Sequence, residues 1–83
     1  MQNLNDTISY MQSDDYKDRF IAEYFQVKIR YERLKEMLIK WDNNMLSFKP
    51  TCPRSIYTLQ LDAMEKYLAI LEARAMIEDV NLS

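Results

Sequence analysis

Glycine and histidine are both absent from this 83-residue chain, which has a single cysteine and two prolines. The tight hairpin turns of β-sheets usually rely on glycine, so a β protein without any is not expected. The chain is rich in Leu, Met, Glu, Lys, Ala and Arg, the residue types with high helix propensity. We therefore predict an all-α fold.

The missing histidine also limits the chemistry that the chain can perform. Histidine is the side chain that most readily acts as a general base near neutral pH. Without it, neither a Ser/His/Asp nor a Cys/His catalytic set can form, and zinc lacks its usual ligands. A glycine-rich phosphate loop is excluded as well. We expect no enzyme, no catalytic residue, no metal and no cofactor, and we interpret Cys52 as a bystander in the connection where it lies.

Disulfides, long apolar runs and a strong charge are absent too. One cysteine allows no disulfide within the chain, and no apolar run reaches the roughly 18 residues typical of a membrane span. The net charge of −2 gives no reason to expect duplex nucleic acid as a partner. A single domain over residues 1–83 is expected. So short a chain buries only about 60% of its unfolded surface, and this favours stabilisation by a homo-oligomer.

Two stretches of the chain repeat apolar residues with alternating spacings of four and three. This spacing places them along one side of a helix and is typical of helices packed against each other. The first stripe consists of Phe20, Tyr24, Val27, Tyr31, Leu34, Leu38 and Trp41. The second consists of Tyr57, Leu61, Met64, Leu68, Leu71 and Ala75. We predict an antiparallel two-helix hairpin: an arm or short helix over 1–13, helices over 14–42 and 53–79, and a connection over 43–52.

Local signals suggest how each predicted helix begins and ends. Ser13 is a suitable N-cap for the first helix, and Asn43 and Asn44 can end it in place of a glycine. Pro53 suits the first position of the second helix, with Thr51 or Cys52 as its cap. The apolar residues of the connection, "MLSF" at 45–48, are expected to pack against the helices. The final "VNLS" is expected to fray.

The second predicted helix carries another stripe beside the first, and we interpret it as an interface between protomers. A widened core-facing side is the alternative reading. Charge is divided unevenly: residues 16–41 hold seven Lys or Arg and four Asp or Glu, whereas residues 55–79 hold two and five. The resulting +3 and −3 could let helices of different protomers attract, or could leave a basic wall on the first helix. A solvated surface with pairs such as Glu36 and Lys40 explains most of these charges without either. The stripe consists of Ile56, Gln60, Ala63, Tyr67, Ile70, Arg74 and Ile77.

Basic and aromatic residues gather where the second helix is predicted to begin. Backbone N–H groups and the helix dipole favour anions at such a position. Two cations, a hydroxyl and an aromatic ring there could hold a phosphate and stack on a base. Capping and simple solvation would explain the same residues without any ligand. The first candidates for a ligand site are Lys49, Thr51, Arg54 and Tyr57.

The second helix also has the form L-x-x-Q-x-x-A-M-x-x-Y-x-x-x-L-x-x-R, with Tyr57 in place of the leucine and the pattern ending at Arg74. Together with the charged stretch "DYKDRFIAEYFQVKIRYERLKEML", it resembles a group of small phage proteins related to a short protein of crAss-like phages. The resemblance covers about residues 15–78. It implies a phage protein built as a helical hairpin.

The layout is also similar to the viral hairpin sponges that counter CBASS and Thoeris immunity in bacteria. Those proteins are short helical hairpins that form symmetric oligomers and hold cyclic nucleotides or related signals between protomers. The resemblance implies a phage anti-defence protein of the host cytoplasm that sequesters a nucleotide-derived signal, of cyclic oligonucleotide or ADP-ribose type, without cleaving it. The alternative is a helical module that binds and inhibits a host protein. Further candidate ligand-binding residues are Tyr10, Tyr16, Lys28 and Arg74.

Overall fold

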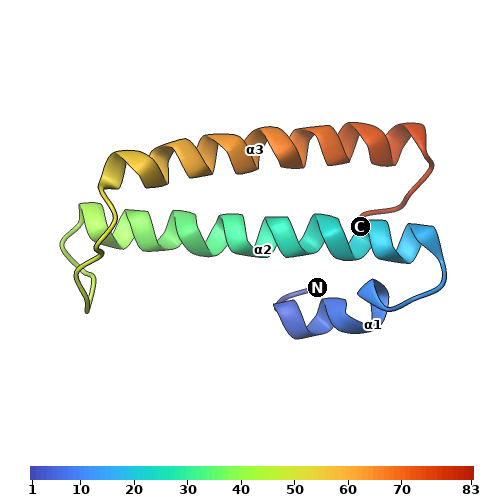
Figure 1. Cartoon of the computed structure of the whole chain (residues 1–83), viewed down its shortest axis with the longest axis horizontal. Coiled ribbons are helices and arrows are strands. Elements are labelled where there is room, and N and C mark those ends of the chain that lie inside the picture. Colours follow the sequence, from blue (N-terminus) through green and yellow to red (C-terminus); the bar gives the residue numbers. More distant parts are fainter.

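The computed structural model describes residues 1–83 and contains helices only, which confirms the all-α prediction. A 3-10 helix, η1 (Leu4–Thr7), leads directly into α1 (Ile8–Met11), followed by α2 (Tyr16–Asp42) and α3 (Arg54–Ile77). The two long helices lie side by side in opposite directions, and α1 lies on the other side of α2 from α3 (Figure 1). No helix is long and apolar enough to span a membrane.

The core lies between α2 and α3 and follows the two predicted stripes. All residues of both stripes are buried or half-buried. The best-packed part lies near the open end of the hairpin, where Leu71 is only 1% exposed and Phe20 2%. Its buried members are Phe20, Tyr24, Leu68, Leu71, Ala75 and Val80. The spacing of four and three therefore identified the side on which each helix contacts the other.

The beginnings of both long helices differ from the sequence expectations. Asp15, not Ser13, is the N-cap of α2, and its side chain accepts a hydrogen bond from the Lys17 amide at 3.0 Å. Ser13 lies two residues earlier, where its hydroxyl donates to the Asp18 carboxylate. Helix α3 begins at Arg54 with Pro53 as its N-cap and without a side-chain cap. Neither Thr51 nor Cys52 caps α3, because the extended Pro53 occupies the cap position itself.

Both long helices end in a residue with left-handed backbone, in the absence of glycine. Asn44 has a φ of 57° and Asp79 a φ of 56°. The next residue in each case donates its amide back into the helix, Met45 to the Lys40 carbonyl and Val80 to the Ala75 carbonyl, both at 2.8 Å. These are the six-to-one hydrogen bonds of Schellman motifs. Asn44 thus takes the glycine-like role that the sequence predicted for the asparagines.

Two expectations about the less regular segments are wrong. Met45 and Phe48 are 71% and 56% exposed, so of the apolar residues of the connection only Leu46 is half-buried. The tail does not fray, because Val80 is buried and Leu82 packs against the core. The reversal at Asp79 explains the second result, since it turns the tail back between α3 and the start of α2 (Figure 1).

The N-terminal segment, expected as an arm or a short helix, forms η1 and α1 and covers the outer side of α2. Asn3 caps η1 by accepting from the Asp6 amide, while the Asp6 carboxylate accepts from the Asn3 amide. Thr7 is 1% exposed, and its hydroxyl accepts a hydrogen bond from the Gln26 side chain of α2 at 3.1 Å. The segment is therefore an ordered third layer on α2.

Candidate ligand site at the closed end of the hairpin

A shallow hollow lies at the closed end of the hairpin, where the chain passes from α2 to α3. Its volume is about 230 Å³. We call it the loop-end hollow and define it by its lining residues Trp41, Asn44, Leu46, Phe48, Lys49 and Pro50. It combines two aromatic rings, an amide and a cation, which are groups that can stack on a base, hydrogen-bond its edge and pair with a phosphate.

Of the four first candidates for a ligand site, only Lys49 lines this hollow. It is exposed and forms no salt bridge, so its ammonium group is available to an anion. Phe48 beside it exposes 56% of its surface, which the packing of a single chain does not explain. The rings of Trp41 and Tyr57 meet edge to face with their centroids 6.0 Å apart, so Tyr57 packs against a ring that lines the hollow without lining it itself.

Arg54, another first-choice candidate, is engaged within the protein. Its guanidinium donates to both carboxylate oxygens of Asp42, at 3.2 and 3.1 Å, and to the Thr58 hydroxyl at 2.7 Å. This paired contact joins the end of α2 to the start of α3, and it lowers the pKa of the Asp42 carboxyl below its ordinary value. A phosphate at Arg54 would have to compete with Asp42 or share the guanidinium with it. Thr51, the remaining first-choice residue, is exposed in the connection.

Tyr16 and Arg74, two of the further candidates, meet at the open end of the hairpin, far from the loop-end hollow. Arg74 contacts the Glu78 carboxylate at 3.0 Å and donates to the Tyr16 hydroxyl at 2.8 Å, and that hydroxyl donates to Glu78 at 2.7 Å. Hydrogen bonds from Tyr16 and Arg74 lower the pKa of Glu78, and the same carboxylate raises the pKa of Tyr16. The guanidinium also lies 4.9 Å from the Phe20 ring centroid. We call this the Tyr16–Arg74–Glu78 cluster.

Lys28 lies in a separate hollow between α2 and α3, with a volume of about 320 Å³. Its ammonium group is 5.7 Å from the centroid of the Tyr24 ring. The Tyr24 hydroxyl donates to Glu72 at 2.7 Å, and burial, followed by this hydrogen bond, raises the pKa of Tyr24 to about 12. Glu32 and Glu65 also line this hollow, so its carboxylates outnumber its cation and make it less suited to a phosphate.

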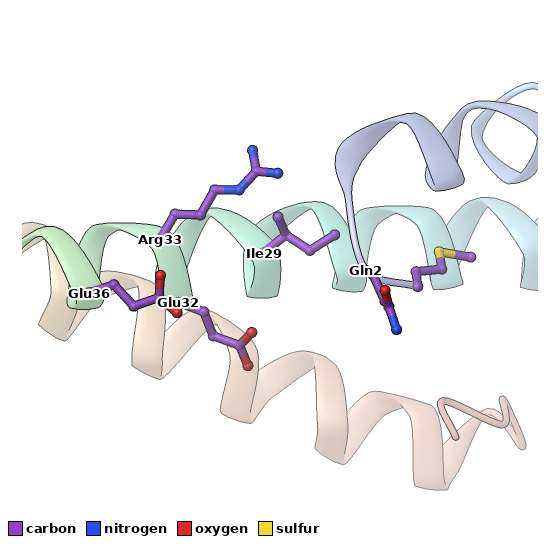
Figure 2. Close-up of a pocket in the computed structure, with 6 residues that line it drawn as sticks. Gln2, Ile29, Glu32, Arg33 and Glu36 are labelled. Carbon is purple, nitrogen blue, oxygen red and sulfur yellow. The ribbon is translucent and has the colours of Figure 1, made fainter.

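The widest hollow lies beside the N-terminal segment and has a volume of about 390 Å³. Figure 2 shows the Arg33 guanidinium extending from α2 on the side opposite to the Glu32 carboxylate, with Gln2 approaching from the N-terminus. Glu36 adds a second carboxylate, so the lining has mixed charge. Tyr10, the last predicted residue, is exposed on α1, which packs on the same outer side of α2.

The predicted site residues thus fall into separate groups and do not converge within one chain. Lys49, Arg54 and Tyr57 lie at the closed end, and Tyr16 and Arg74 at the open end. Sequence reasoning missed Trp41 and Phe48 as lining residues, because the spacing assigned Trp41 to the helix seam and Phe48 to a packed connection. The adjacency of Phe48, Lys49 and Pro50 was the available signal.

A family model described as Sequestin matches residues 14–77, which include α2, the connection and α3. No curated protein and no solved structure matches the chain. The matched segment contains the whole loop-end hollow and, of the Tyr16–Arg74–Glu78 cluster, Tyr16 and Arg74 but not Glu78.

Proposed function

The chain belongs to the Sequestin family, and from this premise we propose that it binds a small ligand and holds it without converting it. The ligand that we propose is a nucleotide-derived immune signal of cyclic oligonucleotide or ADP-ribose type. The protein would then be a phage anti-defence factor that acts in the host cytoplasm as a homo-oligomer. The family name supports sequestration in general, and the chemistry of the loop-end hollow supports this class of ligand.

The observation that carries the proposal is the exposed Phe48 beside Lys49, which forms no salt bridge, in a hollow that Trp41 also lines. Stacking of a base on an aromatic side chain contributes about 1–3 kcal/mol, and a lysine next to it can neutralise one phosphate charge. A volume of about 230 Å³ is small for a dinucleotide, so a second protomer would have to complete the site. The complete absence of histidine supports retention of the ligand without cleavage.

The proposal is tested by thermal unfolding of the purified chain with cyclic di- and trinucleotides and ADP-ribose derivatives. A ligand present at 100 times its Kd stabilises the folded state by about 2.7 kcal/mol. For a chain of this size, the expected rise in Tm is about 11–22 °C. Ligand recovered after denaturation should be chemically intact. Unshifted melting with every compound would contradict sequestration and support the host-protein inhibitor instead.

Matched variants locate the site. Lys49→Ala and Phe48→Ala should leave the ligand-free Tm nearly unchanged, because both residues are exposed, and should reduce the ligand-induced rise. Lys66→Ala removes another exposed lysine, from the middle of α3, and should leave the rise intact. An equal loss in Lys66→Ala and Lys49→Ala would show that only overall charge matters and that the loop-end hollow is not the site.

A further inference from the structure

Helix α3 carries an apolar face that nothing in the single chain covers. Ile56, Ala63, Ile70 and Ile77 recur every seven residues, and at 100° per residue they lie within about 60° of one another. The three isoleucines are 50%, 60% and 84% exposed, respectively. We call these four residues the outer face of α3. Tyr67, which is 41% exposed, lies beside the middle of this face.

The molecule also exposes more surface than a compact protein of its mass. Its accessible surface is 6092 Å², whereas a compact monomer of 10.0 kDa exposes about 5,200 Å². Its radius of gyration is 15.0 Å, compared with about 12 Å for a compact domain of this length. The excess of about 900 Å² is close to the roughly 800 Å² that each partner contributes to a standard protein–protein interface.

The acidic residues of α3 lie away from its outer face. At 100° per residue, Asp62, Glu65 and Glu72 are at least about 100° from Ala63 around the helix. Arg74, at the edge of the face, is already paired with Glu78. Two copies of the face can therefore meet without bringing the carboxylates of α3 together, although α3 as a whole is acidic.

We propose that the outer face of α3 packs against the same face of a second copy, with the two α3 helices antiparallel around a two-fold axis near Tyr67. The seven-residue spacing is unchanged when the direction of the helix is reversed, as a two-fold interface requires. In this register, the small Ala63 of one copy faces the large Ile70 of the other, and Ile56 faces Ile77. Where Ala63 faces Ile70, a large side chain then fills the space over a small one.

The same register brings the two groups of predicted site residues together. Position 54 of one copy becomes level with position 79 of the other, so the loop-end hollow of each copy lies near the Tyr16–Arg74–Glu78 cluster of the second copy. Residues that are separated along one hairpin thus share the boundary between two. The inference rests on the homo-oligomer of the proposed function. Its test contains no ligand, so failure of the α3 contact is distinguished from failure of ligand binding.

The first experiment measures the mass of the intact chain by sedimentation equilibrium without ligand. We expect a dimer, and Ile70→Glu should raise its dissociation constant by about a hundredfold or more, because each dimer would bury two unpaired carboxylates. Met76→Glu is the matched control, since Met76 is 86% exposed on the same helix but points away from the outer face. A monomer in the unmodified chain, or equal effects of both variants, would overturn the proposal.

The second experiment tests the register by disulfide formation in a Cys52→Ser background. Ala63→Cys and Ile70→Cys chains should cross-link efficiently when mixed and poorly when each is alone. Positions 63 and 70 are about 10.5 Å apart along a helix, beyond the 4.4–6.8 Å Cα separation that a disulfide usually spans. Efficient cross-linking of Ala63→Cys chains with each other would indicate a parallel pair and overturn the antiparallel register.

Discussion

Ionisation of Tyr24 should lower the stability of the folded chain at alkaline pH. The substitution Tyr24→Phe should remove this effect. The side chain is 4% exposed, and its hydroxyl donates a 2.7 Å hydrogen bond to Glu72. Burial and this hydrogen bond raise the pKa of Tyr24 to about 12, compared with 10.0 for an ordinary tyrosine. The folded state therefore favours the protonated phenol more strongly than the unfolded state does.

The sign and size of the effect follow from this difference. A group whose pKa is raised on folding contributes its full stability below its unfolded pKa and loses it as pH rises through the folded pKa. For Tyr24 this window runs from pH 10 to about pH 12. A difference of two pKa units corresponds to about 2.7 kcal/mol of unfolding free energy across the window. This is a large part of the few kcal/mol expected for so short a chain.

The assay is urea unfolding of the unmodified chain and of Tyr24→Phe at several pH values between 9 and 12. At pH 9 the variant should be less stable by about 1–3 kcal/mol, because the buried ring loses its hydrogen bond to a carboxylate. The difference should shrink as pH rises and disappear by about pH 12. Tyr10→Phe, an exposed tyrosine on α1, is the control. A constant difference between Tyr24→Phe and the unmodified chain across this range would refute the reasoning.

Three further predictions concern the core, the closed end and the open end. Leu71→Ala should destabilise the chain by about 2–5 kcal/mol, measured by urea unfolding, because Leu71 is 1% exposed. Asp42→Asn should lower the ligand-free Tm yet tighten binding of a phosphorylated ligand in calorimetry, because it frees Arg54; unchanged or weaker binding would exclude Arg54 as a ligand group. Glu78→Gln should reduce the stability lost in acid, because a lowered pKa contributes stability that disappears as pH falls below 4.5; an unchanged acid midpoint would contradict this.

Most of the helical part of the fold was predictable, because the spacing of apolar residues states directly which side of a helix is buried. The seams through Phe20 and Leu71 follow from that rule alone. The first residue of each long helix was not predictable to the same degree. Ser13 and Asp15 both have suitable capping side chains, and only the path of the chain from α1 decides that Asp15 caps α2.

The connection and the tail could not be predicted from hydrophobicity, because their packing depends on backbone direction. Met45 and Val80 both follow a left-handed residue at the end of a helix, in the same local motif. One is exposed and the other buried, since only the second is turned toward the open end of the core. Neither spacing nor residue type distinguishes the two.

The candidate site was predictable as a region but not as a set of contacts. Lys49 and Arg54 do lie at the closed end of the hairpin, yet Arg54 is held by Asp42, twelve residues earlier. Such a pair depends on how the connection folds back. Trp41 illustrates a second limit, because one side chain both belongs to the helix seam and lines the hollow.

The tail that turns back at Asp79 has a consequence for how the hairpin opens. Val80 secures α3 to the core at one end, and the pair of Arg54 with Asp42 secures it at the other. Between them, seam residues such as Val27, Leu61 and Met64 are only half-buried. A helical hairpin usually loosens from its ends. Here amide hydrogens near the middle of α3 should exchange with solvent sooner than those around Leu71, so the two helices would separate first along the centre of their length.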